Sequence, residues 1–194
     1  MNKKDVIDFF DGLASAWDDN LIHDNEKINL ILDYADIKEG SDVLDVACGT
    51  GVLFPDYLSR NVERVTGVDI STAMVGHAKA KFADPRIMLL AADIEEVTFS
   101  KPFDRCMVYN AFPHFPDPAH LIHCLSEKLM AGGRLTVAHS RGRAAINNHH
   151  AGTASKVSIG LLPEDELAAL FEQYFDVDVV VSDDSIYVVS GVKQ

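Results

Sequence analysis

A glycine-containing loop inside VLDVACGTGVL, residues 43–53, is the first feature of this sequence that could do chemistry. An apolar run typical of a buried strand stops at Cys48, and a new apolar pattern begins after Gly51. Glycines at positions 49 and 51 let the backbone approach a ligand closely and adopt positive φ angles. N–H groups at the start of the following helix would face that ligand. Taken alone, the loop could also be an ordinary tight turn.

Acidic residues at the ends of the next two apolar runs support a ligand. Asp69 follows Gly51 by 18 residues, close to where βαβ nucleotide folds place a carboxylate that accepts both ribose hydroxyls, although it could also only cap a helix. Asp93 follows in the third run, within reach of an adenine on the same rim. A dinucleotide is disfavoured, because Phe54 replaces the third glycine of G-x-G-x-x-G and Asp45 would repel a pyrophosphate. The residues therefore predict a ribose-containing ligand other than NAD.

Strand-like and helix-like segments alternate along the chain, which predicts a doubly wound, mostly parallel α/β sheet. The strand-like segments of its parallel part are 43–48, 64–70, 87–94, 103–110 and 133–140. In the tail, a helix-like segment precedes two strand-like runs joined by Asp183 and Asp184, which predicts a terminal antiparallel hairpin. Such sheets bind ligands beyond the carboxyl ends of their parallel strands. The glycine loop and both acidic residues fall at those ends.

Composition and charge restrict the class of partner. The 194 residues, 47% of them hydrophobic, can bury a full core, so residues 1–194 are expected to form a single domain. The formal net charge of -13 argues against nucleic acid, whose nonspecific binding depends on Lys and Arg. The three cysteines lie far apart, and no apolar run approaches the roughly 20 residues of a membrane span. We expect a cytoplasmic monomer or homodimer with a small-molecule partner, no nucleic acid and no membrane.

Five stretches together resemble a known family. VLDVACGTGVL, VTGVDIS, AADIEEVTF, FDRCMVYNAFPHF and EKLMAGGRLTV look like the ordered motif series of class I S-adenosylmethionine-dependent methyltransferases. The opening FFDGLASAWDD is similar to the N-terminal helix of small-molecule members, including ubiquinone and menaquinone biosynthesis methyltransferases, where it helps to cover the cofactor. The resemblance implies a Rossmann-like seven-stranded sheet, S-adenosylmethionine as cofactor, and methyl transfer to a small molecule. A non-catalytic cofactor-binding protein of the same fold is the alternative.

The resemblance also implies roles for the matched residues. The cofactor-binding residues expected on this basis are Asp45, Ala47, Gly49, Gly51, Asp69, Ile70, Asp93, Ile94, Asn110 and Trp17. Those at 45–51 would surround the methionine end, Asp69 would hold the ribose, and the pair at 93 and 94 would meet the adenine. Asn110 would lie where the methyl group is delivered. Residues 1–35 would form cap helices, with Phe9, Phe10 and Trp17 closing over the cofactor.

Histidines are the candidate bases. Methyl transfer is an in-line displacement at an activated methyl group, so the protein mainly aligns donor and acceptor and, where needed, removes a proton. His114 and His139 border the expected acceptor pocket and could act as the base, or could be structural. We expect no metal, but a metal-assisted reaction is an alternative, with candidate ligands His114, His139, His149 and His150.

The segment 141–162 is expected to be an insertion that specifies the acceptor. No Asp or Glu occurs between Lys128 and Pro163, although this stretch contains several basic residues. Guanidinium groups bind carboxylate or phosphate in a bidentate manner. We therefore expect an anionic acceptor, held by Arg141, Arg143 and His149, with a solvated basic loop as the alternative.

Overall fold

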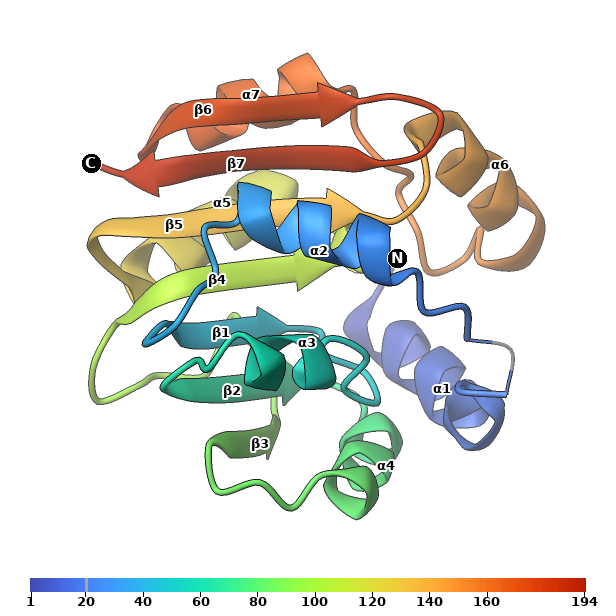
Figure 1. The fold of residues 1–194 in the computed structure, drawn as a ribbon. Coiled ribbons are helices and arrows are strands. Elements are labelled where there is room, and N and C mark those ends of the chain that lie inside the picture. Colours follow the sequence, from blue (N-terminus) through green and yellow to red (C-terminus); the bar gives the residue numbers. More distant parts are fainter. Residues whose placement is uncertain (20) are drawn as a thin grey trace.

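The computed structural model describes residues 1–19 and 21–194 and contains a seven-stranded sheet between layers of helices (Figure 1). The strands are β1 (Asp42–Val46), β2 (Arg64–Asp69), β3 (Ile87–Ala91), β4 (Phe103–Tyr109), β5 (Leu129–His139), β6 (Phe175–Ser182) and β7 (Tyr187–Lys193). Their order is β3-β2-β1-β4-β5-β7-β6. The pairs from β3 to β5 are parallel, and β7 is antiparallel to both of its neighbours. The predicted doubly wound, Rossmann-like sheet with a C-terminal antiparallel hairpin is confirmed.

Helices cover both faces of the sheet and its carboxyl edge. They are α1 (Lys3–Leu13), α2 (Asn25–Tyr34), α3 (Phe54–Ser59), α4 (Thr72–Lys81), α5 (Pro118–Lys128), α6 (Arg143–Thr153) and α7 (Glu164–Phe171), with short 3-10 helices η1 (Ala14–Ala16) and η2 (Phe112–His114). Figure 1 shows α1 and α6 beyond the tips of the parallel strands. Among the described residues, no helix is long and apolar enough to cross a membrane.

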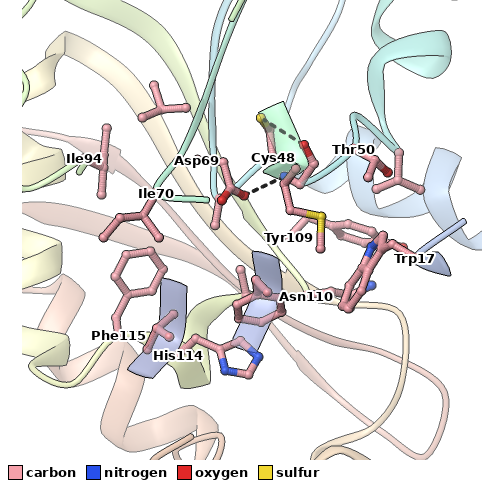
Figure 2. Close-up of a pocket in the computed structure, with 18 of the residues that line it drawn as sticks. Trp17, Cys48, Thr50, Asp69, Ile70, Ile94, Tyr109, Asn110, His114 and Phe115 are labelled. Carbon is pink, nitrogen blue, oxygen red and sulfur yellow. Dashed lines mark hydrogen bonds between the residues drawn. The ribbon is translucent and has the colours of Figure 1, made fainter. Parts of the chain in front are cut away.

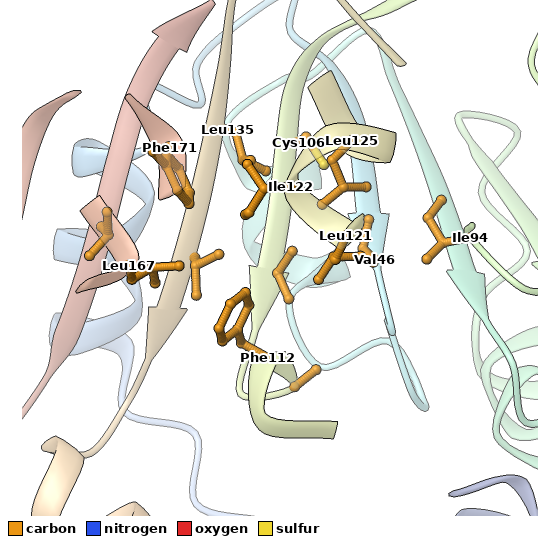
Figure 3. Packing of buried hydrophobic residues seen from close by; sticks show 14 of the residues in the cluster. Val46, Ile94, Cys106, Phe112, Leu121, Ile122, Leu125, Leu135, Leu167 and Phe171 are labelled. Carbon is orange, nitrogen blue, oxygen red and sulfur yellow. The ribbon is translucent and has the colours of Figure 1, made fainter. Parts of the chain in front are cut away.

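Two apolar cores hold the helical layers to the sheet. Leu44 and Val46 of β1 pack with α5 and α7, where Leu121, Leu125 and Phe171 are fully buried (Figure 3). The alternate positions of β1 face the other core, which α2 and α3 complete. Because successive strand residues point to opposite faces, position 45 points toward this second core and away from the first.

Two element boundaries differ from the sequence prediction in ways that affect the site. Strand β3 ends at Ala91, so Asp93 lies in the loop that follows the strand. The hairpin connection between β6 and β7 is longer than the two expected residues, because the Asp183 carboxylate accepts hydrogen bonds from the backbone N–H groups of Ser185 and Ile186 and extends the turn. The segment 141–162 contains α6, which lies at the carboxyl edge, and residues that follow α6 pack against Val6 of α1.

Candidate active site

A cavity of about 680 Å³ lies at the carboxyl ends of the parallel strands. The strand order reverses between β1 and β4, and ligands of doubly wound sheets bind at this position. The volume falls in the range of roughly 300–1,000 Å³ that is typical of small-molecule and cofactor sites. Figure 2 shows Ile70 and Ile94 toward one side of the cavity, and Trp17, Tyr109 and Asn110 toward the other.

The loop after β1 brings backbone to the cavity wall. Ala47, Gly49 and Gly51 all have positive φ, at 55°, 54° and 84°. A Cβ added at Gly49 would meet nothing within 4 Å, so this glycine leaves space on the cavity side. A Cβ at Gly51 would come within 2.6 Å of the Phe54 ring, and Gly51 does not line the cavity. The two glycines predicted to approach a ligand thus differ: Gly49 faces the cavity, whereas Gly51 permits packing beneath the loop.

Asp69 is fixed at the base of the cavity by backbone hydrogen bonds. Its two carboxylate oxygens accept from the N–H groups of Gly49 and Ser71, each at 2.8 Å. Burial raises the pKa of this carboxyl, while the two backbone N–H groups oppose the increase. Each carboxylate oxygen can accept a further hydrogen bond. Asp69 and the neighbouring Ile70 both line the cavity, so the carboxylate is held in place and remains available to a ligand.

The loop after β3 forms the next part of the rim. Asp93 and Ile94 line the cavity as predicted, and Ile94 is buried. One Asp93 oxygen accepts from the backbone N–H of Glu95, and the other forms an ion pair with Lys3. A polar carboxylate therefore lies beside an apolar surface that Ile94 and Phe115 provide (Figure 2).

The N-terminal segment is attached to the three loops that form this rim. Lys3 pairs with Asp93 and, at 2.6 Å, with Glu95 after β3. Asp11 accepts hydrogen bonds from the Ser71 hydroxyl and the Ala73 backbone N–H, which follow β2. Asp18 accepts from Thr50 in the glycine loop at 2.6 Å, and pairs with Lys81 of α4. The N-terminal segment thus contacts each of the three loops that the sequence predicted to bind a ligand.

Two of the three aromatic residues predicted to cover the cofactor line the cavity. Phe10 and Trp17 line the cavity, and their ring centroids are 5.6 Å apart. Phe10 also packs edge-on against His114, at 4.9 Å. Phe9 does not line the cavity and instead packs with Val6 in a small cluster that includes residues following α6. The cover therefore consists of Phe10 and Trp17, while Phe9 anchors the helix.

Asp45 does not line the cavity. Strand alternation directs its side chain toward the core beside Tyr57, where Asp45 is only 3% exposed. Burial, with a contribution from the negative charge of Asp69, raises the pKa of Asp45 to about 8, against the lowering effect of Tyr57. The direct contact predicted for Asp45 is not present in this geometry.

The ends of β4 and β5 form the opposite wall and are held together by a clamp. Asn110 has a φ of 53°, and its side-chain oxygen accepts from the Ser140 N–H at 2.9 Å. Its amide group donates to the Ser140 hydroxyl at 3.1 Å. Asn110 and Ser140 both line the cavity. The clamp fixes the backbone immediately before Arg141.

Basic residues on this wall differ from those predicted. Arg141 lines the cavity, but Arg143 belongs to the first turn of α6 and lies 3.7 Å from the Glu164 carboxylate. His149 is exposed and does not line the cavity. Sequence reasoning missed Lys27, which comes from α2, lines the cavity and donates to the Ser140 carbonyl oxygen at 3.0 Å. No local motif marks Lys27, because only packing brings α2 to the end of β5.

The histidines fall into two groups. His114 and His150 line the cavity with ring centroids 5.0 Å apart. His114 Nδ1 lies 2.6 Å from the Val157 carbonyl oxygen, which can only accept, so Nδ1 carries the proton and Nε2 is unprotonated. Burial lowers the pKa of His114 to about 4. His139 is 1% exposed, lies outside the cavity lining, and has neither ring nitrogen hydrogen-bonded to any described residue.

The four histidines do not form a metal site in the described part of the chain. No group of three or more His, Cys, Asp or Glu residues there has an arrangement that could hold a metal ion. Burial, and the neighbouring His114 and His150, lower the pKa of His139 to about 3. His139 is therefore neutral and separated from the cavity.

Comparisons with known proteins agree with this geometry. Residues 43–133 match a family model described as a methyltransferase domain. Over 138 residues the chain is 29% identical to malonyl-[acyl-carrier protein] O-methyltransferase from Acetivibrio thermocellus, covering 70% of this chain and 49% of that protein. Over 137 residues it is 30% identical to ubiquinone biosynthesis O-methyltransferase from Alkalilimnicola ehrlichii, covering 65% of this chain and 55% of that protein. The chain spans about half the length of the curated relatives it matches.

Solved structures show the same fold. Magnesium protoporphyrin IX methyltransferase from Synechocystis, with bound S-adenosylhomocysteine, has a TM-score of 0.74 and 16% identity, over 99% of each chain. An S-adenosylmethionine-dependent methyltransferase from Aquifex aeolicus has a TM-score of 0.69 and 18% identity, over 86% of this chain and 89% of that one. The sheet order and the cavity at its switch point define a doubly wound ligand-binding fold. Together with the sequence matches, they show that residues 43–133 form a methyltransferase domain of the class I S-adenosylmethionine-dependent type.

Proposed function

We propose that this protein transfers a methyl group from S-adenosylmethionine to a small-molecule acceptor. The observation that carries the proposal is the Asp69 carboxylate, which two backbone N–H groups hold at the cavity base while it lines the cavity. A carboxylate at the end of β2 can accept hydrogen bonds from both hydroxyls of a ribose. The names of the matched O-methyltransferases support the same activity.

The residues present fit this cofactor. Asp93 and Ile94 provide a polar edge and an apolar face for an adenine, and Gly49 leaves room for close approach of the ligand to the backbone. Asp69, Asp93 and Glu95 make this end of the cavity acidic, which suits a ligand with a net positive charge. When bound, the cofactor supplies a methyl group that its sulfonium already activates. The protein therefore needs mainly to orient the acceptor and exclude water.

The acceptor would occupy the side of the cavity formed by Tyr109, Asn110 and Ser140. Phe10 and Trp17 cover this space and limit the access of water. His114 contributes an unprotonated Nε2, which can accept a hydrogen bond from an acceptor hydroxyl, although its lowered pKa of about 4 makes it a weak base. His139 has no part in this proposal, because it does not reach the cavity lining.

The acceptor is proposed to be anionic, with Arg141 as its recognition residue. Arg141 lines the cavity directly after the clamped Ser140, so its backbone position is fixed. A guanidinium can bind a carboxylate through two parallel hydrogen bonds. Arg143 and His149 are omitted, because the first lies near Glu164 and neither lines the cavity.

Binding and turnover test this function separately. Calorimetry with S-adenosylmethionine and S-adenosylhomocysteine should show binding of both by the purified protein. Incubation with S-adenosylmethionine and a cell extract depleted of its own methyltransferases should then produce S-adenosylhomocysteine. Binding without turnover across all extract fractions would favour a non-catalytic cofactor-binding protein. Absence of binding to either compound would refute the proposal.

A further inference from the structure

Charges are segregated along the cavity. The cofactor end carries Asp69, Asp93 and Glu95, and Lys3 is paired with the last two of these. A carboxylate placed at this end would face like charges, which disfavours its binding. An anionic group would therefore be directed to the opposite end.

Two basic residues from distant parts of the sequence converge at that opposite end. Lys27 Nζ donates to the Ser140 carbonyl oxygen, which places its charge next to the backbone of Arg141. Asp24 also lines the cavity, with its carboxylate 3.8 Å from Lys27 Nζ, and caps the N-terminus of α2 through the Lys27 N–H. The Arg141 guanidinium forms no ion pair or hydrogen bond within residues 1–19 and 21–194. Among the residues that line this end, Lys27 and Arg141 carry two positive charges against the one negative charge of Asp24. Asp183, outside the lining, interacts with Lys27, so Arg141 carries the less compensated charge.

Large apolar side chains remain exposed along the same mouth. Trp17, Leu21 and Ile22 line the cavity, yet they are 40%, 44% and 89% exposed. Single exposed apolar residues are common on protein surfaces. Three in one short segment, bordering a cavity, form the kind of patch that marks an apolar ligand or partner. We call these three side chains the apolar rim.

We propose that the acceptor is an amphipathic carboxylate, whose carboxylate group lies between Lys27 and Arg141 and whose apolar chain runs outward over the apolar rim. This inference rests on the proposed function in taking this end of the cavity as the acceptor end. The rim is continuous with the cavity, which favours one ligand that spans both. Each methylene group of the ligand that is transferred from water to the surface of Leu21 or Ile22 contributes to affinity. The clamp between Asn110 and Ser140 fixes the backbone that precedes Arg141, so a carboxylate bound by Arg141 would lie beside the wall where transfer is proposed.

Decanoate is the probe that tests this inference. Calorimetry should show that decanoate binds the protein both with and without saturating S-adenosylhomocysteine. Acetate, which lacks the chain, and decyltrimethylammonium, which reverses the charge, should each bind at least tenfold more weakly. Fluorescence of the single tryptophan, Trp17, should respond to decanoate, because its ring is part of the rim. The titrations with and without S-adenosylhomocysteine separate this inference from the proposed function. If the proposed function fails, S-adenosylhomocysteine does not bind, whereas decanoate binding is still measured in its absence.

Three variants locate the binding site. Lys27→Met and Arg141→Gln should each weaken decanoate binding about tenfold or more, since a charge-assisted hydrogen bond is lost. Ile22→Ser should weaken decanoate binding several-fold without changing the weak binding of acetate. Because Ile22 is almost fully exposed, this variant is not expected to disturb folding.

Two exposed positions away from the cavity serve as matched controls. Lys101→Met removes an exposed positive charge, and Met130→Ser removes an exposed apolar side chain. Both should bind decanoate like the wild type. Wild-type affinity in Lys27→Met and Arg141→Gln, equal binding of decyltrimethylammonium, or no decanoate binding by folded protein would each overturn the inference.

Discussion

Replacing Asp69 by alanine should greatly weaken cofactor binding while leaving the fold intact. The substitution removes the acceptor for the N–H groups of Gly49 and Ser71, each 2.8 Å from a carboxylate oxygen. Gly49 lines the cavity, where water can replace the carboxylate as the acceptor of its N–H, whereas Ser71 is fully buried and its N–H would lose its partner. The stability cost should therefore be the roughly 1–3 kcal/mol expected for a lost buried partner.

The loss of affinity follows from the number of hydrogen bonds. A ribose would donate two hydroxyl groups to the Asp69 carboxylate, and hydrogen bonds to charged groups contribute roughly 1.5–3 kcal/mol each. Their combined loss is about 3–6 kcal/mol, which corresponds to roughly 100-fold to 20,000-fold in the dissociation constant. Asp69→Asn retains one carbonyl oxygen and should give an intermediate loss.

Calorimetric titration with S-adenosylhomocysteine measures this effect, with circular dichroism and thermal unfolding as checks on folding. Asp84→Ala is the matched control, because Asp84 lies outside the cavity and bonds to Arg86 in the turn before β3. Equal affinity of wild type and Asp69→Ala for S-adenosylhomocysteine would refute the role given to Asp69. Equal weakening in Asp84→Ala would show that the effect is not specific to the site.

Three further predictions concern stability and the cover. Because the pKa of Asp45 rises from 3.8 to about 8 on folding, the folded state keeps a proton that the unfolded state has lost between these values. Stability should therefore fall as pH rises from about 4 to 8, by up to about 1.4 kcal/mol per pH unit, and urea unfolding at several pH values should give a flatter profile for Asp45→Asn. Gly142→Ala should destabilise the fold by about 1–3 kcal/mol in thermal unfolding, since the added Cβ would meet the Asp183 carbonyl oxygen at 2.2 Å. Gly76→Ala, on an open face of α4, should instead stabilise the fold by about 0.5–1 kcal/mol. The reverse ranking of the two variants would contradict this packing. Lys3→Met should speed the release of S-adenosylhomocysteine up to about fivefold in stopped-flow tryptophan fluorescence, because a partly exposed ion pair contributes about 1 kcal/mol or less. Lys4 pairs with Asp8 of the same helix, so Lys4→Met should behave like the wild type.

The sequence by itself determined the features that depend on local pattern. Alternating apolar runs predicted the parallel strands, and the paired runs near the C-terminus predicted the antiparallel hairpin. Because parallel strands end at one edge, Gly49, Asp69 and Asp93 could be assigned to one cavity without a structure, and all three line it. A short motif at a strand end fixes both the chemistry and the approximate location of its residues.

Only the tertiary structure decided which side chains near those motifs reach the cavity. Asp45 and Gly51 lie within the matched motif, yet one points into the core and the other packs against Phe54. The physical reason is that the direction of a side chain changes from one residue to the next along the backbone, so sequence neighbours point to opposite faces. Arg141 and Arg143 differ in the same way, because α6 begins between them and directs the second toward Glu164.

Contacts between distant segments could also not be predicted from the sequence. Lys27 and Arg141 are separated by more than half the chain, and neither the composition of α2 nor its spacing marks Lys27 as a cavity residue. Their convergence depends on the packing of α2 against the sheet and on the Asn110–Ser140 clamp at the ends of β4 and β5. Local patterns determined the end of the cavity that carries Gly49, Asp69 and Asp93, whereas long-range packing decided the opposite end, where Lys27 and Arg141 meet. That wall is assembled from elements that no single motif spans.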